Sequence, residues 1–299
     1  MLSKRDSQKE EKTFKVKWIY QALGITKQAY YKRQNTDNKQ ASMEAKVINL
    51  VNEKRKKQVR MGTRKLQQDL KDEFLKQGIK VGRDALFTLL RKQGMLVKRT
   101  KRFFITTDSK HYFYTSPNLL KELDITHSEQ AFVSDITYIS IENKHAYLAL
   151  VTDAYSKKIM GWNLQDNMKV SLVKDALKMA YKNTMHNNSN IIHHSDRGIQ
   201  YCCPDFTDFA KQKGFLLSTT QKYDPYENAI AERINGILKY EFGLKRTIPK
   251  ISIAKKMVAE AIAIYNHQRL HWSLDLKTPE QVHKEYNKQK YKSYAKKVA

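Results

Sequence analysis

The spacing of apolar residues predicts a helical first part of the chain and a mixed second part. Over residues 42–97, apolar positions recur three and four apart in three successive segments, and glycines stand near the segment ends, which is typical of amphipathic helices. Residues 14–33 predict two short helices on either side of Leu23 and Gly24. The polar residues 35–41 predict a linker between these two helical regions.

After about residue 124 the pattern changes to short runs rich in β-branched and aromatic residues, which predict strands. Residues 132–141 and 145–156 predict a hairpin whose turn is formed by 142–144. We expect the later elements to be a strand at 158–165, a helix at 171–183, a strand at 190–196, a helix at 204–214, a strand at 215–220, and helices at 225–242 and 252–270. Three strands followed by alternating helices and strands predict an α/β layer structure with a mixed sheet.

Composition changes this picture by pointing to a polyanionic partner. The 299 residues hold 56 Lys and Arg against 30 Asp and Glu, a formal charge of +26, and 40% of them are hydrophobic. A chain of this length and apolar content normally forms more than one domain. Residues 1–110 alone hold 29 Lys and Arg against 11 Asp and Glu. This uneven surplus favours a nucleic-acid-binding first third over a protein that merely carries solvated lysines.

Cysteine usage and hydropathy exclude several other classes of protein. Cys202 and Cys203 are the only cysteines and are adjacent, which excludes a disulfide framework and a self-contained zinc site. The nearby His193 and His194 complete no zinc-ligand spacing with them. No apolar run reaches the length of a membrane helix, and the polar start MLSKRDSQKEEK is no signal peptide. We therefore expect an intracellular protein in contact with nucleic acid.

The helix expected from Thr26 onward has the layout of the second helix of a helix-turn-helix motif. It would present side chains of the types that contact phosphates and base edges, namely Lys27, Gln28, Tyr31, Lys32 and Arg33. An ordinary helical hairpin is the alternative, because the signature is short. Residues 98–103, KRTKRF, are likewise either a connector that lies along a phosphate backbone or a solvated linker.

Residues 226–242, YENAIAERINGILKYEF, contain three glutamates, of which one lacks a local structural role. The apolar stripe of this expected helix is formed by Ile230, Ile234, Ile237 and Leu238. At about 100° per residue, Glu232 lies roughly 200° from Ile230 and from Ile234, so it faces away from the core. Its neighbours on that polar face are Asn228, Asn235 and Lys239. Glu227 instead completes a capping box with Asp224 and Pro225, which predicts a helix that begins at Pro225.

Two aspartates stand where they could meet Glu232. Asp135 lies inside an apolar strand, where an acid is costly unless it is paired or bound to a cation. Asp196 ends the strand at 190–196, and ligands gather at strand ends in α/β sheets. Three carboxylates that converge cannot all stay ionised without a cation, and Mg²⁺ or Mn²⁺ suits oxygen ligands. Taken singly, each acid is also compatible with a turn, a cap or a solvated face.

These residues carry a resemblance. DITYI (135–139), HSDRGIQY (194–201) and ENAIAERINGILK (227–239) together resemble the catalytic core of bacterial insertion-sequence transposases related to retroviral integrases, the DDE group. The 35 residues between Asp196 and Glu232 are the interval typical of this group. The stretch 265–282, YNHQRLHWSLDLKTPEQV, resembles the end signature of the family, and ALGITKQAYYKR and MGTRKL resemble its amino-terminal helical region. The resemblance covers nearly the whole chain and is nearest to the second-frame product of two-frame elements.

The resemblance implies an RNase H-like catalytic core with helices on both faces of a mixed sheet, preceded by an all-α helix-turn-helix region. It implies that Asp135, Asp196 and Glu232 are catalytic and together hold two Mg²⁺ or Mn²⁺ ions. It further implies phosphoryl transfer on DNA, in which water cuts at a transposon end and the freed 3′-hydroxyl attacks a second phosphodiester. A DNA-binding regulator or decayed element without catalysis, and a simple nuclease of the same fold, are the alternatives.

Further residues are candidates for contacts with DNA. Arg197, Asn228 and Lys239 could position the DNA backbone, or could simply be solvated. A second group, Asn266, Arg269 and His271, could contact DNA or brace the last helix against the sheet. The tail at 284–299 mixes lysine and tyrosine and could follow phosphates, although a frayed solvated tail is the plainer interpretation.

We expect four regions: a helix-turn-helix candidate at 1–41, a helical DNA-binding or connecting region at 42–110, the catalytic core at 124–283 and the basic tail at 284–299. Related elements encode an upstream helix-turn-helix product with a leucine zipper, often joined to the second frame by a frameshift. This sequence shows no sustained heptad run, so we expect end recognition to need that partner or a fusion with it. Paired cutting of two ends implies a homo-oligomer on DNA.

Overall fold

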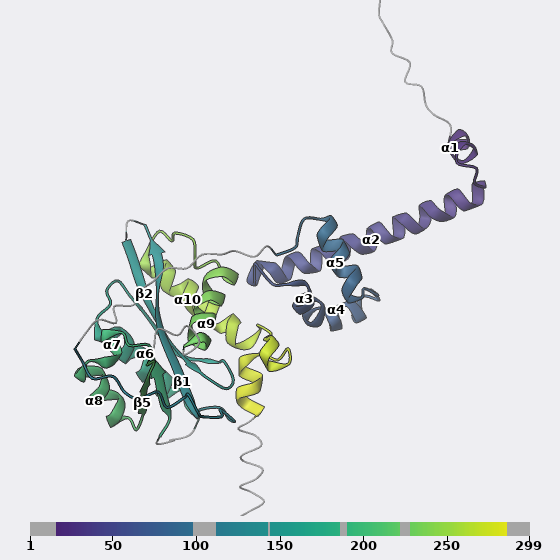
Figure 1. The fold of residues 1–299 in the computed structure, drawn as a ribbon. Coiled ribbons are helices and arrows are strands. Elements are labelled where there is room, and N and C mark those ends of the chain that lie inside the picture. The colour runs from purple at the N-terminus through teal and green to yellow at the C-terminus, as the bar shows by residue number, and fades with distance from the viewer. Residues whose placement is uncertain (1–15, 98–111, 143, 186–189, 222–227, 286–299) are drawn as a thin grey trace, which may run out of the picture.

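The computed structural model describes residues 16–97, 112–142, 144–185, 190–221 and 228–285. The structure comprises a small helical module and an α/β core, and the second half of the long helix α2 (Lys27–Lys57) belongs to the module while its first half projects away from both (Figure 1). Within the described residues, no helix is both long and apolar enough to cross a membrane.

The helical region contains α1 (Val16–Ala22), α2 (Lys27–Lys57), α3 (Thr63–Asp69), α4 (Lys71–Lys76) and α5 (Arg83–Lys92). The second half of α2 packs against α3, α4 and α5 to form what we call the helical module, residues 43–97. Its buried apolar residues are Val47, Val51, Met61, Leu66, Leu70, Phe74, Ile79, Leu86, Leu89 and Leu90. This cluster contains no residue of the α/β core, so the module has a hydrophobic core of its own.

The linker predicted at 35–41 is wrong, because these residues lie inside the 31-residue helix α2. The segment contains neither glycine nor proline, and its polar side chains form bonds that a helix allows. Thr36 Oγ1 donates to the Lys32 carbonyl oxygen at 2.9 Å, and Gln40 Nε2 donates to Glu44 Oε1 at 2.9 Å. A domain boundary at residue 41 would therefore fall within a helix, and the division into domains stays a prediction.

The start of α2 is confirmed. Thr26 is the N-cap residue, and its side chain accepts a hydrogen bond from the Ala29 amide at 3.1 Å. Gly24 has a φ of 65°, a conformation that favours glycine, and it makes the turn between α1 and α2. The first helix of the expected pair is thus short, whereas the second continues to Lys57.

The core sheet consists of β1 (Ala131–Ile141), β2 (Lys144–Asp153), β3 (Ile159–Gln165), β4 (Ile192–Ser195) and β5 (Leu216–Thr219) in the order β3-β2-β1-β4-β5. Neighbouring strands among β1, β2 and β3 are antiparallel, whereas β1, β4 and β5 run parallel. The mixed sheet predicted from the order of elements is confirmed, as is the hairpin between β1 and β2.

Helices cover both faces of this sheet. On one face lie α6 (Val170–Lys182), α7 (Ile199–Cys202) and α8 (Pro204–Gln212), packed around Phe132, Ala149 and Met160. On the other lie α9 (Ala229–Glu241) and α10 (Ile251–His267), packed around residues such as Ile139 and Leu148. The chain continues through the short 3₁₀ helix η1 (Trp272–Leu274) to a last helix over 279–285. Side chains alternate between these two apolar layers along β1.

The sequence predicted α9 less accurately than the strands. α9 begins at Ala229, four residues after the expected Pro225, and Asn228 is its N-cap position. The Asn228 side chain does not cap the helix, because its Nδ2 donates to the Ser134 carbonyl oxygen of β1 at 3.1 Å. The expected capping box at 224–227 lies outside the described residues. The four-residue helix α7 was not predicted.

Candidate functional site

Strand register brings Asp135 and Asp196 side by side. β1 and β4 run parallel with Ser134 paired to Ser195, so the next residue on each strand is one of the two aspartates. Asp135 lies on the same face of β1 as Val133 and Ile139, which pack on the α9 and α10 side of the sheet. The two acids therefore lie at adjacent positions in the sheet, and Asp135 faces α9.

Asp135 is held by two hydrogen bonds. Asn235 Nδ2 on α9 donates to Asp135 Oδ2 at 2.8 Å, and the Ile136 amide donates to Asp135 Oδ1 at 2.9 Å. Burial raises the pKa of Asp135 to about 8, the charge of Asp196 adds to this rise, the Asn235 bond opposes it, and Glu232 adds a smaller increase. Asp135 is thus a buried acid surrounded by negative charge.

Glu232 lies on α9 as its helical phase predicts. Its side chain is exposed, whereas Ile234, two residues later, is buried. Partial burial raises the pKa of Glu232, and the nearby charge of Asp196 raises it further. Asp196 itself accepts a hydrogen bond on Oδ1 from the Gly198 amide at 3.1 Å, in the turn that follows β4.

The other two glutamates of this segment differ from Glu232. Arg269 binds Glu241 through two bonds, from Nε to Oε2 at 2.7 Å and from Nη2 to Oε1 at 2.8 Å. This pair joins the end of α9 to the chain after α10, which is a structural role. Glu227 lies outside the described residues.

The three acids lie within electrostatic reach of one another without forming a closed set of ligands. Asp196 raises the pKa of both Asp135 and Glu232, yet among the described residues no three His, Cys, Asp or Glu side chains are grouped closely enough to hold a metal ion. In the same part of the chain neither Asp135 nor Glu232 forms an ion pair. A donor set of carboxylate oxygens fits a hard divalent cation, which would relieve the raised pKa values of Asp135 and Glu232.

The candidates for DNA contacts near the acids differ in exposure. Lys239 Nζ lies 4.0 Å from the centre of the Tyr138 ring; burial lowers its pKa to about 8, and Asp135 counteracts part of that change. Asn228 is buried and holds the start of α9 against β1. Arg197 is half-buried and follows Asp196 directly.

The contacts of the second group favour bracing over DNA binding. Asn266 is buried, and its amide bonds both the backbone nitrogen and the backbone oxygen of Ile159, at 2.9 and 3.0 Å. Arg269 is buried against Glu241. His271 is also buried, and its ring lies edge-on to that of Tyr265 with 5.2 Å between centres. These side chains tie α10 and the following turn to the rest of the core.

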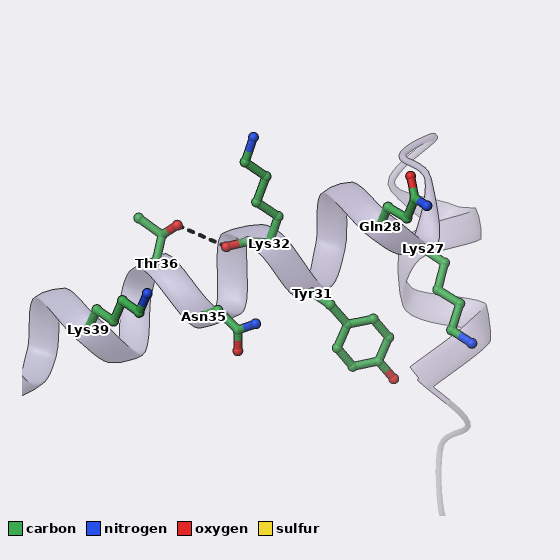
Figure 2. A pocket seen from close by; sticks show the side chains of 7 residues that line it. All are labelled: Lys27, Gln28, Tyr31, Lys32, Asn35, Thr36 and Lys39. Atoms are coloured by element: carbon green, nitrogen blue, oxygen red, sulfur yellow. Dashed lines mark hydrogen bonds between the residues drawn. The ribbon is translucent and has the colours of Figure 1, made fainter.

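The helix-turn-helix candidates lie on the projecting half of α2. Figure 2 shows Lys27, Gln28, Tyr31 and Lys32 along this helix, together with Asn35, Thr36 and Lys39, around an open pocket. All of them, and also Arg33, are exposed, and their side chains project in several directions. They are accessible to nucleic acid, and their contact with DNA stays a prediction.

Sequence reasoning placed Asn235 on the polar face of α9 but gave it no role. The signal was its position three residues after Glu232, which puts both on one side of the helix. The two histidines that precede the cysteines in the sequence lie against serine side chains of neighbouring strands. His193 Nε2 lies 2.8 Å from Ser134 Oγ, His194 Nδ1 lies 2.8 Å from Ser218 Oγ, and both cysteines are buried and free.

Comparison with known proteins identifies relatives of this chain. The family described as integrase core domain matches residues 118–225, and a second model with that description matches residues 213–279. An insertion element IS600 31 kDa protein from Shigella sonnei is 32% identical over 272 residues, which cover 89% of this chain and 98% of that protein. The transposase of insertion sequence IS3A from Escherichia coli (strain K12) is 32% identical over 173 residues, 58% of this chain and 60% of that protein.

A solved structure is similar at lower identity. The catalytic core domain of HTLV-2 integrase, in complex with magnesium, has a TM-score of 0.41 and 16% identity, and the match covers 52% of this chain and 97% of that one.

Proposed function

The chain belongs to the IS3-related DDE transposases, whose integrase core has an RNase H-like fold, and from this premise we propose that it cuts transposon ends and joins them to target DNA. The reaction is metal-dependent phosphoryl transfer without a covalent enzyme intermediate. Asp135, Asp196 and Glu232 are its catalytic residues.

The observation that carries this proposal is the pairing of Ser134 with Ser195, which sets Asp135 beside Asp196 on adjacent parallel strands below α9. Asp135 is buried beside a second carboxylate, and its pKa of about 8 reflects first its burial and then the negative charge of Asp196. A protein retains such an arrangement where a cation from solution completes it.

Mg²⁺ or Mn²⁺ fits this donor set of carboxylate oxygens, and two ions would activate the attacking oxygen and stabilise the leaving 3′-oxygen. Asp135, whose pKa is raised by both other acids, would contact both ions. Asp196 and Glu232 would each hold one. Asn235 keeps Asp135 in place through its 2.8 Å hydrogen bond.

The two chemical steps are balanced exchanges at phosphorus. Water first breaks the phosphodiester at the transposon end and leaves a 3′-hydroxyl. That hydroxyl then attacks a phosphodiester of the target, so one P–O bond forms for each one broken. Lys239, beside Tyr138 and within reach of the charge of Asp135, would contact a phosphate of the bound DNA.

DNA binding by the first 110 residues completes the proposal. This region carries most of the excess positive charge, and the projecting half of α2 offers exposed Lys27, Gln28, Tyr31 and Arg33. Selective recognition of the element's ends would come from an upstream-frame partner product or a fusion with it, and joint cutting of two ends from a homo-oligomer.

Incubation of the purified chain with an oligonucleotide that carries the terminal repeat, with and without Mg²⁺, tests the function. We expect Mg²⁺-dependent cleavage and joined products, both lost in Glu232→Gln and retained in Glu260→Gln, which removes an exposed acid of α10. Binding without cleavage would indicate a regulator, and cleavage without joining would indicate a nuclease. Either outcome would overturn the proposal.

A further inference from the structure

The helical module meets the core along a polar seam, which we define as residues 58–65 of the module against residues 268–272 of the core. Gln58 Nε2 lies 3.5 Å from the Gln268 carbonyl oxygen, and the Arg64 guanidinium lies 5.5 Å from the centre of the Trp272 ring. No apolar cluster of the described residues spans both parts. Polar contacts of this kind hold two parts together less firmly than a shared hydrophobic core would.

The seam buries more positive than negative charge. Lys65 is only 9% exposed, and among the described residues no hydrogen bond or ion pair joins its ammonium group to a partner. Its charged neighbours are Arg269, Glu241 and Arg233, and Glu241 already accepts both bonds from Arg269. Burial, reinforced by Arg269, lowers the pKa of Lys65 to about 8. Lys65 and Arg233 are thus two cations that the seam does not neutralise.

Two buried polar atoms at the seam also lack partners in the part of the chain that the structure describes. They are Gln58 Oε1 and His271 Nε2, in side chains that are 5% and 8% exposed. Burial and the surrounding cations lower the pKa of His271 to about 2, so the ring is neutral and can carry its proton on Nε2. A buried donor without an acceptor is unfavourable, so the polar groups of the seam are incompletely satisfied within the described residues.

We propose that this seam binds a phosphate of the DNA backbone, with charge from Lys65 and Arg233. One duplex would then be held by the helical module and the core together. Arg233 follows Glu232 directly in α9, so DNA that leaves the acidic site passes this phosphate-binding position next. The inference rests on the proposed function, because it takes DNA as the polyanion.

Substitution of Lys65 distinguishes a purely structural role of this residue from a phosphate-binding role. Lys65→Met keeps the unbranched, apolar stem of the side chain and removes the charged ammonium group. If the charge serves DNA, the free protein keeps or gains stability, because replacing an uncompensated buried cation by an apolar group is often neutral or stabilising. If Lys65 stabilises the seam, the same change lowers the melting temperature and leaves DNA binding alone.

The test measures binding of the full chain to a fluorescein-labelled duplex by anisotropy over a series of salt concentrations, together with the melting temperature without DNA. For Lys65→Met we expect the slope of log K against log salt to fall by about 1, and the affinity to fall about eightfold near about 0.1 M salt. The melting temperature should be unchanged or higher. Lys178→Met is the matched control, since Lys178 is exposed on α6, on the opposite face of the sheet from α9, and should leave the slope unchanged.

Arg233→Gln provides a second variant, because Arg233 is exposed and its loss removes little packing. It should reduce the salt slope in the same way, whatever the folding behaviour of Lys65→Met. Wild-type affinity and slope in both variants would overturn this inference and leave the proposed function standing. A wild-type chain that binds no duplex at all would overturn both.

Discussion

Two groups of acids on the same sheet differ in the partners that the chain supplies to them. Glu129, just before β1, and Asp153, at the end of β2, both face His283 of the last helix; His283 Nε2 lies 3.3 Å from Glu129 Oε1, and Nδ1 lies 3.6 Å from Asp153 Oδ2. The other group, Asp135, Asp196 and Glu232, receives an amide from Asn235. The first group is paired with a histidine of the chain, whereas no ion pair among the described residues includes Asp135 or Glu232.

The difference shows what each group does. At the Asp153 site the backbone adds its own donors, since the amides of Glu129 and Ser156 both bond Asp153 at 2.8 Å. Every partner there comes from the protein, and the effect is to fix the last helix to the sheet. At the Asp135 site, burial and the charge of Asp196 raise the pKa to about 8, which supports the metal-binding role that we propose for this acid.

Removing charge from the second group should have the largest effect. We expect Asp135→Asn, Asp196→Asn and Glu232→Gln each to lose cleavage and strand transfer by several orders of magnitude, because each acid would hold metal and none would hold the duplex. DNA affinity, measured by anisotropy in the same samples, should stay within about twofold of the wild type, a difference of about 0.4 kcal/mol. Retained catalysis in any of the three would remove that residue from the proposed triad.

Removing charge from the first group should affect folding instead. Asp153→Asn leaves His283 buried without its acid, and we expect the free energy of unfolding to fall by about 3–5 kcal/mol in urea denaturation. Asp205→Asn is the control, because Asp205 pairs with Lys174 on the surface and should cost at most about 1 kcal/mol. Equal losses for the two variants would mean that the His283 site has no special structural role.

Substitution of Asn235 should reduce activity by less than the loss of any of the three acids. Asn235→Ala removes the hydrogen bond to Asp135, and we expect strand transfer to fall about 10–100-fold, as for other side chains that orient metal ligands. The diagnostic readout is the Mg²⁺ concentration for half-maximal activity, which should rise because Asp135 is less well placed. A drop in activity without that rise would indicate only a packing defect.

The smallest expected effect is a pH dependence of folding at His283. Burial alone would lower the pKa of His283, but its interactions with the acids Asp153 and Glu129 outweigh burial and leave the pKa raised above 6.5. The stabilisation is therefore complete below pH 6.5 and is lost as the pH rises through the raised value. Urea denaturation should show stability falling across that window in the wild type, and a flatter profile in His283→Gln would confirm the source.

Local patterns in the sequence predicted most of the core. FVSDITYISI predicted β1 because its β-branched and aromatic residues favour a strand, and the phase of the isoleucines in α9 correctly placed Glu232 on the exposed side. The positions that sequence missed depend on distant partners. Asn228 bonds β1 across 94 residues, which moves the start of α9, and His283 meets Glu129 only in the folded chain. The polar residues 35–41 were wrongly predicted to form a linker, because an exposed helix such as this part of α2 is also polar.

The measurement that tests the contrast most directly is thermal unfolding with and without Mg²⁺ above pH 8, where Asp135 is ionised. An ion that binds only the folded state at about 100 times its dissociation constant should stabilise the wild type by about 2.7 kcal/mol. We predict that Asp135→Asn loses this gain, whereas Asp153→Asn starts from a lower melting temperature and still shows the gain. Equal stabilisation of the wild type and Asp135→Asn by Mg²⁺ would contradict the account.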